Sequence, residues 1–545
     1  MYLSKIEIEN YRTFEHIEMY FHDQMNYLVG DNNIGKSNFL DLLETALSGR
    51  GFLETDFLDP DKPVRVFFTL ADLPGPQGDK AVMEMAQYVH EAAPVLRNGE
   101  TGEVLPLEYI RRMYYLPQSL QEAARQMADA LEMRNIGELF RICLSSGEGL
   151  EELRRVLAQD GFDVDLAGPP EAAAVRLMRA LYGSGEEMGA GKSTAQMIFA
   201  VGVFIMARLF QKKQSRAVPF EEIVVTRKDG KRYLPVMVSI DEPEHHLHPY
   251  MQRAVLAFVH RIMNNQVPFF VHLIQRVLGI DGLDGQVFVV THSTDALIND
   301  YRSIIRLYWD EQRKVQAACG VTFHFDREIE KHLIMHFPEI KEALYARCAV
   351  LVEGETEYGS FEYFARTLGA NFDNYGICLI NARGESSIAK IAQLVRRFHV
   401  PALCLYDRDV MEGRKPSPHV FYTDYICYEM DVVMTCLARG ARKRLDEIIR
   451  DVTESGTYVS SALVKKASQK LGISRTIRPP KKLENISGRD RKGLEFYYFA
   501  WLYGNKGVII GRAMGLSLQA EEIPPSFCRV IRAAVERAGG RLRGS

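Results

Sequence analysis

Apolar and polar positions alternate near the start of the chain and then give way to helical spacing. Leu3–Ile8 and Ile17–Phe21 alternate as half-buried strands do, and the apolar run Met25–Val29 leads into a loop that contains glycine. Apolar residues then recur at helical spacing over Phe39–Leu47. The pattern predicts strand, glycine loop and helix, followed by another strand over Phe57–Leu70.

Residues 81–183 are predicted to form a mainly helical insertion in an α/β frame. Helical spacing occurs over Ala81–Ala93, Gln121–Leu131 and Glu171–Leu181, with glycine-rich joints between these segments. The frame is predicted to resume with one long helix and two strands, over Ala195–Phe210, Pro235–Ile240 and Val287–Thr291.

A second α/β pattern begins near residue 345. Three short apolar strands alternate with two helices, which requires parallel pairing and right-handed crossovers. The strands are predicted over Val350–Val352, Ile377–Ile380 and Ala402–Tyr406, and the helices over Ser360–Leu368 and Ser387–Phe398. Beyond Arg439 the pattern is helical and basic.

Composition narrows the class of protein. The 545 residues are 47% hydrophobic and 25% charged, as in globular proteins, and no run of about 18 apolar residues predicts a membrane span. The eight cysteines are scattered singly, without a CxxC pair, and the N-terminus lacks an apolar export signal. We therefore expect reduced thiols, a cytoplasmic location and no membrane partner.

Charge is distributed unevenly along the chain. Residues 438–545 contain 22 Lys and Arg against 10 Asp and Glu, whereas the first 437 residues contain 45 and 61. A basic last fifth on an acidic body favours a polyanion, in particular DNA, as a partner of the C-terminal part. Solvated charge is the alternative interpretation of such a count.

A phosphate-binding loop is indicated by Gly30-x4-Gly35-Lys36-Ser37, which follows a predicted strand and precedes a helix. Glycines let backbone N–H groups close around phosphates, Lys36 supplies positive charge to the β and γ oxygens of ATP, and Ser37 binds Mg²⁺. The loop residues expected to bind ATP are Gly30, Asn32, Asn33 and Gly35.

The strand over Pro235–Ile240 ends in two carboxylates that suit ATP hydrolysis. Asp241 is expected to hold Mg²⁺ through water, and Glu242 to polarise the attacking water. With Leu247-His248-Pro249 and His292 downstream, the set resembles an ABC-type ATPase head. That resemblance makes Leu247–Pro249 the D-loop and His292 the histidine that senses the γ-phosphate. The alternative is a metal cluster made of His245, His246 and His248.

Gly189-Ala190-Gly191-Lys192-Ser193-Thr194 has two interpretations. It is similar to a second phosphate loop, but Glu186 stands where the first glycine is required and no apolar strand precedes it. Its place before a long helix is that of the ABC signature, which binds the γ-phosphate of the opposite subunit. We favour the signature, with Gly189, Gly191 and Ser193 as ATP-binding residues, and this implies a dimer. Gln77 and Gln118 are the candidates for the Q-loop glutamine.

Carboxylates at two further strand ends predict a second active site. Glu353 and Glu357 follow the strand over Val350–Val352, and Asp407 and Asp409 follow the strand over Ala402–Tyr406. Such oxygens suit Mg²⁺ or Mn²⁺ and phosphodiester cleavage by one or two ions. The order Glu-Gly-x-x-Glu and then Asp-x-Asp, with βαβ alternation between them, resembles a Toprim domain.

Two more residues are candidates for the same site. Glu429 is similar to a further Toprim carboxylate, and the start of a surface helix is the alternative. Lys506, in Gly504-Asn505-Lys506-Gly507, is similar to a lysine that stabilises the transition state in related nucleases; a structural role is its alternative.

An ABC ATPase with a helical insertion, followed by a Toprim domain, resembles the OLD (overcoming lysogenization defect) family of nucleases, which includes the nuclease subunit of the Gabija anti-phage system. The implied fold class is α/β: an ABC-type ATPase head with a helical dimerisation insertion, then a Toprim domain with a helical, basic C-terminal part. The expected boundaries are 1–80 and 184–340 for the head, 81–183 for the insertion, and 345–545 for the Toprim part.

The resemblance implies an ATP-regulated, divalent-metal-dependent DNA endonuclease in an anti-phage setting. It also implies a homodimer or homotetramer formed through the ATPase part, and a helicase or a retron reverse transcriptase as a partner. One alternative is an ATPase sensor or scaffold whose inactive Toprim cleft controls a partner effector. A structural-maintenance-of-chromosomes type of ATPase is the other, but it predicts long coiled-coil arms, and only about a hundred residues with Gly and Pro breaks separate the two head segments.

Overall fold

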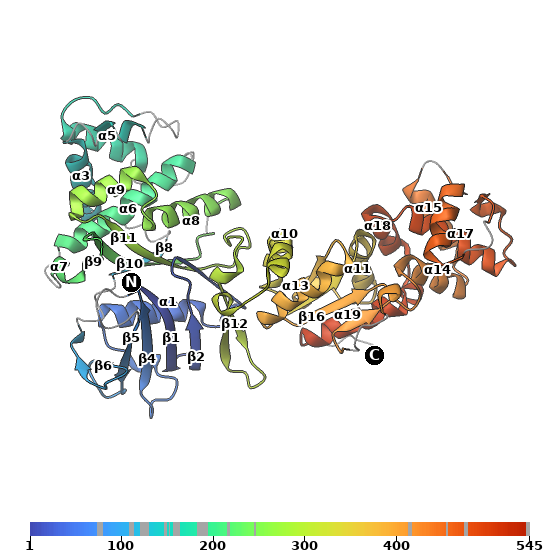
Figure 1. Cartoon of the computed structure of the whole chain (residues 1–545), viewed down its shortest axis with the longest axis horizontal. Coiled ribbons are helices and arrows are strands. Elements are labelled where there is room, and N and C mark those ends of the chain that lie inside the picture. Colours follow the sequence, from blue (N-terminus) through green and yellow to red (C-terminus); the bar gives the residue numbers. More distant parts are fainter. Residues whose placement is uncertain are drawn as a thin grey trace. The chain divides into compact units, whose positions relative to one another are not determined.

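The computed structural model describes two compact units, Met1–Phe323 and His324–Ser545 (Figure 1). Among the residues that it describes, no helix is both long enough and apolar enough to cross a membrane. The described residues are 1–72, 80–107, 114–119, 130–145, 150–151, 153–155, 164–182, 194–214, 219–244, 247–411, 417–453, 456–473 and 478–540.

The first sheet of the N-terminal unit is antiparallel, in the strand order β2-β1-β4-β5-β6-β7. Apolar and charged residues alternate along β1, as they do in a strand with one buried face. Ile6 and Ile8 are buried, whereas Lys5 and Glu7 lie on the other face. The strands β1, β2, β4, β5, β6 and β7 span Tyr2–Tyr11, Phe14–Tyr20, Val64–Ala71, Lys80–Gln87, Val95–Asn98 and Val104–Leu105.

The helix expected over Ala81–Ala93 is wrong, because this segment contains β5. Ala, Met and Glu favour a helix, but Met83, Met85 and Gln87 are buried at every second position, and β5 pairs with β4 along its whole length. Strand pairing therefore overrides the local propensity. The β-strands of the first sheet thus extend into the segment predicted to be a helical insertion.

The second sheet of this unit has the order β13-β12-β3-β11-β10-β8, with β9 also paired to β10. Its five central strands are parallel, so their carboxyl ends meet at one edge. The parallel strands β3, β8, β10, β11 and β12 span Met25–Val29, Tyr114–Ser119, Arg232–Asp241, Gly282–Val290 and Ile304–Trp309. The antiparallel strands β9 and β13 span Val225–Thr226 and Val315–Cys319.

Helix α1 fills the space between the two sheets, since Phe39 and Leu42 belong to one apolar cluster with Ile6 of β1 and Phe288 of β11.

The helices expected over Glu171–Leu181 and Ala195–Phe210 are confirmed as α5 and α6, whereas most of Gln121–Leu131 lies outside the described residues. The helices α1, α3, α5, α6, α7, α8 and α9 span Lys36–Ser48, Ala130–Leu144, Pro170–Tyr182, Thr194–Gln214, Phe220–Ile223, Pro249–Met263 and Pro268–Leu278. The short 3-10 turns η1, η3 and η4 span Glu54–Asp56, Tyr301–Ser303 and Gly320–Thr322.

The C-terminal unit is built on a four-stranded parallel sheet in the order β15-β14-β16-β17. The predicted βαβαβ alternation is confirmed. The strands β14, β15, β16 and β17 span Cys348–Val352, Ile377–Asn381, Ala402–Tyr406 and Val420–Tyr422, and the helices α11 and α13 span Glu355–Thr367 and Glu385–Arg397. This unit begins at His324, before the expected boundary, because Leu333, Phe337 and Ile340 of helix α10 (Arg327–Ala343) are buried and α10 contacts α13 and β15.

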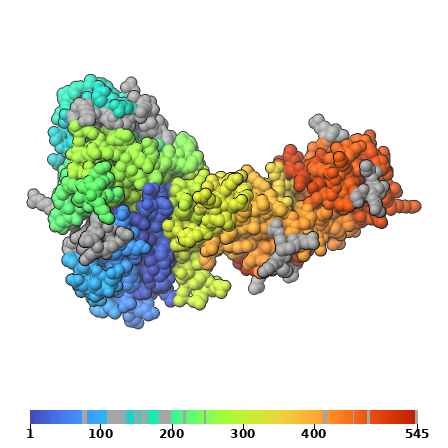
Figure 2. Space-filling model, viewed as in Figure 1, coloured from blue at the N-terminus to red at the C-terminus, as the bar shows by residue number. Residues whose placement is uncertain are grey.

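Helices dominate the rest of this unit, as predicted, and the residues of this last part have the darkest orange to red colours in Figure 2. Phe527 of α19 contacts Phe361, Phe364 and Tyr428, so the last helix is part of the core. The helices α12, α14, α15, α16, α17, α18 and α19 span Phe372–Tyr375, Tyr428–Ala438, Arg442–Val452, Ser461–Lys470, Arg491–Gly504, Val508–Ser517 and Pro525–Arg537. The shorter elements η5, η6, η7, β18 and β19 span Arg408–Val410, Leu483–Asn485, Ala520–Glu522, Tyr458–Val459 and Lys481–Lys482.

Two glycines let α11 and α18 approach to backbone contact. A Cβ on Gly359 would lie 2.6 Å from the carbonyl oxygen of Val508, and a Cβ on Gly511 would lie 2.1 Å from that of Thr356. The Thr356 hydroxyl also accepts from the Gly507 N–H at 3.0 Å. The turn before α18 is therefore fixed against the start of α11.

We expect Gly511→Ala to lower the free energy of unfolding of the C-terminal unit by about 1–3 kcal/mol, because the new methyl group would overlap the Thr356 carbonyl group. Thermal unfolding of the full chain, followed by circular dichroism, measures the change. Gly488→Ala is the matched control, because a Cβ there has nothing within 4 Å. Identical midpoints for Gly511→Ala and the wild type would contradict this close contact.

Candidate functional site

Lys36 begins helix α1 directly after the glycine loop, and its side chain turns back into that loop. Its ammonium donates to the carbonyl oxygens of Gly30 at 2.9 Å and Asp31 at 2.8 Å. Burial lowers the pKa of Lys36, while the nearby charges of Asp31, Asp241 and Glu242 oppose this shift. Carbonyl groups of the loop backbone thus hold the Lys36 side chain. The carboxylates Asp241 and Glu242, both singled out from the sequence, lie close enough to affect its pKa.

Glycine is required at both ends of this loop. Gly30 and Gly35 have φ angles of +143° and +110°. A Cβ on Gly30 would lie 2.5 Å from the Leu307 carbonyl oxygen, and a Cβ on Gly35 would lie 2.6 Å from Thr13 Oγ1. Gly35 also stands at the N-cap of α1, where free backbone N–H groups favour an anion. The geometry therefore suits phosphate.

Asp241 ends β10 beside the loop and shares a hydrogen bond with the Ser37 hydroxyl. Burial and then the Glu242 charge raise the pKa of Asp241 to about 6, and the Ser37 hydrogen bond opposes this shift. Within the described part of the chain, the buried Oδ1 atom of Asp241 has no hydrogen-bond partner. A carboxylate and a hydroxyl in this arrangement suit a hard cation such as Mg²⁺.

Glu242 and His292 lie side by side at the same edge of the sheet. Their Oε1 and Nε2 atoms are 3.8 Å apart, and Glu242 has a left-handed φ of +47°. The carboxylate of Glu244, which the sequence analysis did not single out, accepts from the Thr291 hydroxyl at 2.7 Å and from the His292 N–H at 2.5 Å. Glu244 therefore ties the segment after β11 to the segment after β10 and places His292.

Several sequence candidates of this unit lie outside the described residues: Gly189, Gly191, Lys192, Ser193, His245, His246 and Gln77. Only the backbone of Gln118 is described, in β8. His248 precedes α8, and its ring stacks on that of Tyr250 with centroids 6.0 Å apart.

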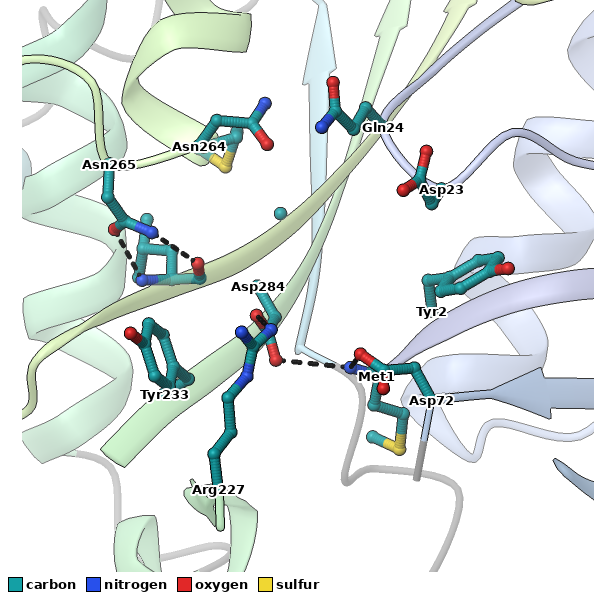
Figure 3. A pocket seen from close by; sticks show the side chains of 13 residues that line it. Met1, Tyr2, Asp23, Gln24, Asp72, Arg227, Tyr233, Asn264, Asn265 and Asp284 are labelled. Carbon is teal, nitrogen blue, oxygen red and sulfur yellow. Dashed lines mark hydrogen bonds and ion pairs between the residues drawn. The ribbon is translucent and has the colours of Figure 1, made fainter. Parts of the chain in front are cut away.

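A separate polar cavity of about 560 Å³ lies near the amino ends of the central strands (Figure 3). Asp23, Asp72 and Asp284 line it, and Asp284 accepts from the Met1 amine at 3.2 Å and pairs with Arg227. Carboxylates repel phosphates, and the glycine loop faces the opposite, carboxyl ends of these strands. This cavity is therefore not the nucleotide site.

In the C-terminal unit, Glu353 directly follows β14 and Glu357 lies in the first turn of α11. Glu357 is 9% exposed, and burial, together with the charges of Glu429 and Glu353, raises the pKa of Glu357 to about 8. Burial also raises the pKa of Glu353, whose buried Oε2 atom has no hydrogen-bond partner among the described residues. The two glutamates thus belong to one group of interacting carboxylates, which we name the carboxylate pocket.

Asp407 enters the same pocket from the end of β16. It is 9% exposed, and its Oδ1 accepts from the Tyr428 N–H at 3.1 Å. Burial, then the charges of Glu357 and Glu429, raise the pKa of Asp407 well above its usual value. Glu429 is 3% exposed, so its interpretation as a surface residue is wrong. Glu353, Glu357 and Glu429 thus all lie close enough to Asp407 to raise its pKa.

Asp409 lies at the rim and forms an ion pair with Lys470 of α16. Burial alone would lower the pKa of Lys470, but this ion pair outweighs burial and raises it. Glu385, in the first turn of α13, adds a further negative charge near Glu353. The sequence analysis did not identify Lys470 or Glu385. Lys470 lies 61 positions from Asp409, and only the fold brings the two together.

Lys506 stands between α17 and α18, next to the carboxylates. Burial lowers its pKa, but Glu429, Tyr503 and Glu357 outweigh burial and raise the pKa of Lys506. Its ammonium lies 5.1 Å from the centroid of the Tyr503 ring. The fold thus brings this cation close to the carboxylates Glu429 and Glu357.

The carboxylate pocket has the donors that a divalent ion prefers, since its oxygens are hard ligands and their negative charges are costly to bury without a cation. Within the described chain, the one group with three ligand atoms all within 4.8 Å is Glu7, Glu9 and His16. In that group Glu7 pairs with Lys5 and Glu9 with Arg65, so it is an ion-pair network on an open sheet. The pocket carboxylates are therefore not closed around a single ion.

Comparison with known proteins finds family models that match parts of both units. Residues 344–409 match the family model described as overcoming lysogenization defect protein-like, TOPRIM domain. Residues 1–70 match an AAA ATPase domain, and residues 231–299 match an AAA domain, putative AbiEii toxin, Type IV TA system. The resemblance to the OLD family, with an ATPase head followed by a Toprim domain, is confirmed.

Other relatives match only in part. The chain is 37% identical over 43 residues to the DNA replication and repair protein RecF of Bacillus mycoides, and 35% identical over 65 residues to that of Oceanobacillus iheyensis. These matches cover 8% and 11% of this chain and span 12% and 18% of the two relatives.

Among solved structures, the SMC head domain from Thermotoga maritima is 13% identical, with a TM-score of 0.31, over 58% of this chain and 98% of that one. The C-terminal region of the Burkholderia pseudomallei OLD protein is 14% identical, with a TM-score of 0.24, over 36% and 99%.

We expect Glu357→Gln to stabilise the metal-free protein at neutral pH. The folded pKa of Glu357 is raised from 4.5 to about 8, so between these values the folded state keeps a proton that the unfolded state loses, and wild-type stability falls as pH rises. The variant avoids this loss, worth up to about 3 kcal/mol at pH 7, and gains nothing below about pH 4.5.

Thermal midpoints in EDTA from pH 4 to pH 8 measure this difference. Glu355→Gln is the matched control, because Glu355 lies in the same helical turn but is exposed. An equal effect of both variants, or a gain that does not depend on pH, would contradict buried repulsion at Glu357.

Proposed function

We propose that this chain, an OLD-family protein with an ATPase head and a Toprim domain, is an ATP-regulated, divalent-metal-dependent DNA endonuclease. The observation that carries the proposal is the set of buried carboxylates at the carboxyl ends of β14 and β16. A fold that needed only stability would not bury them together, because removing paired negative charges from water is costly. A divalent cation would compensate those negative charges, and the bound cation could in turn hold the anionic phosphodiester.

In the ATPase head, we propose that the glycine loop binds the phosphates of ATP and that Lys36 neutralises them. Ser37 and Asp241 hold Mg²⁺, Glu242 polarises the attacking water, and His292 senses the γ-phosphate. Their positions at one sheet edge support these roles. The segment with Gly189, Gly191 and Ser193 acts as the signature toward a second copy, which makes the protein a homodimer or a homotetramer through this part.

In the Toprim domain, Glu353, Glu357, Asp407, Asp409 and Glu429 would hold Mg²⁺ or Mn²⁺. Such an ion, when bound, would activate water and polarise the phosphodiester. Lys506 stands beside these carboxylates and stabilises the negative charge that develops on the phosphorane.

We further propose a cytoplasmic, anti-phage role with DNA as the substrate. The basic C-terminal helices provide the charge for a polyanion, and the cysteines in the described chain are free thiols, as in a reducing compartment. A helicase or a retron reverse transcriptase with its nucleic acid is the partner that we expect for a family member of this kind.

Asp407→Asn tests the nuclease directly. Cleavage of supercoiled plasmid with Mg²⁺ or Mn²⁺, with and without ATP, is expected to fall by more than about 10²-fold, since several kcal/mol of transition-state stabilisation are lost. ATP binding is expected to be unchanged. Asp451→Asn, at an exposed carboxylate of α15, is the matched control. If Asp407→Asn still cleaves the plasmid, the Toprim site does not carry out the cleavage. If the wild type does not cleave it under any of these conditions, the sensor or scaffold function is favoured.

Glu242→Gln tests the ATPase. Phosphate release from ATP is expected to fall by about 10²-fold or more while ATP affinity stays within a few-fold, because the amide cannot polarise the attacking water. Fluorescent-nucleotide titration and phosphate release measure the two quantities. Glu100→Gln, in the exposed turn between β6 and β7, is the control. Full turnover by Glu242→Gln would assign the polarising role to another residue.

A further inference from the structure

Three lysines converge on the ring of Tyr503 at the end of α17. The ammonium groups of Lys466, Lys470 and Lys506 lie 5.2, 5.7 and 5.1 Å from the ring centroid. We name these four residues the lysine cluster. Cation–π attraction is significant within about 6 Å, so one aromatic ring positions all three cations.

Neighbouring residues hold this ring and its lysines in place. The Tyr503 ring stacks on Phe499, with centroids 5.2 Å apart and an interplanar angle of 21°. A Cβ on Gly504 would lie 2.2 Å from Leu463 Cδ2, so α16, which carries Lys466 and Lys470, contacts the end of α17 directly. The cluster is therefore built on two packed helices rather than on a loose surface.

The lysines differ in what balances their charge. Lys470 pairs with Asp409, and Lys506 is influenced by Glu429 and Glu357 of the carboxylate pocket. Lys466 is exposed, and the described residues give it the Tyr503 ring but no carboxylate in ion-pair contact. Lys466 is thus the member of the cluster whose positive charge is left for an external anion.

We propose that the lysine cluster is a binding subsite for a backbone phosphate of DNA, next to the phosphate that is cut at the carboxylate pocket. The inference rests on the proposed nuclease function, which it extends to the position of the substrate. Lys470 and Lys506 connect the subsite to the pocket, and Lys466 contacts the neighbouring phosphate. A lysine is a point charge, so the subsite reads the backbone rather than the base sequence.

Fluorescence anisotropy with a duplex oligonucleotide and the full chain in EDTA tests the subsite without catalysis. Binding over a series of KCl concentrations gives the slope of log affinity against log salt. Lys466→Gln is expected to make the slope shallower by about 0.9 and to weaken binding by about 5–10-fold at 0.1 M salt, which is the effect of one lost phosphate contact. Lys466→Arg is expected to restore the wild-type slope.

Lys465→Gln is the matched control, because it removes the same charge from the adjacent exposed position of α16, outside the cluster. An unchanged slope for Lys466→Gln, an equal loss in both variants, or no DNA binding by the wild type in EDTA would each overturn the subsite. Plasmid cleavage by the same preparations separates the two proposals. If the wild type binds DNA through Lys466 but does not cut it, the subsite is retained and the nuclease function is refuted. If the wild type cuts DNA but Lys466→Gln has no effect on binding, only the subsite is refuted.

Discussion

Repulsion among buried carboxylates is the constraint on which the C-terminal unit depends. Glu357, Asp407 and Glu429 are each less than a tenth exposed, and each lies close enough to disturb the ionisation of another. Parallel strands cause this convergence, because their carboxyl ends meet at one edge. The cations Lys470 and Lys506 come from the helical C-terminal part, so that part completes the charge balance of the Toprim pocket rather than simply following it in sequence.

The ATPase head also contains a buried carboxylate that lies close to another negative charge. Burial and the neighbouring charge of Glu242 disfavour the charged form of Asp241, and Lys36, the first residue of α1, supplies an opposing charge. In both units, carboxylates at the end of a strand are buried, and their negative charge destabilises the folded state unless a cation binds there. Stability is thus exchanged for a site that favours a metal ion. Gly30 and Gly511 each allow a close backbone contact in their own unit.

Much of this could be predicted from local pattern. The glycine loop and the carboxylates at strand ends are recognisable from adjacent residues, so Lys36, Asp241 and Asp407 could be singled out as candidates from the sequence. The strand β5 was missed because its Ala, Met and Glu favour a helix and only its pairing with β4 makes it a strand. Glu244 and Lys470 were missed for a related reason: their partners are distant in sequence, and no spacing rule connects them.

The most direct test of this account is whether a divalent ion relieves the buried repulsion. Differential scanning calorimetry of the full chain at pH 8, titrated with Mn²⁺, compares the wild type with Asp407→Ala. The account predicts that Mn²⁺ raises the midpoint of the C-terminal unit in the wild type, since an ion that binds only the folded state stabilises it, and that this rise is lost in the variant. Equal shifts in both proteins, or none in the wild type, would contradict a metal site in this pocket.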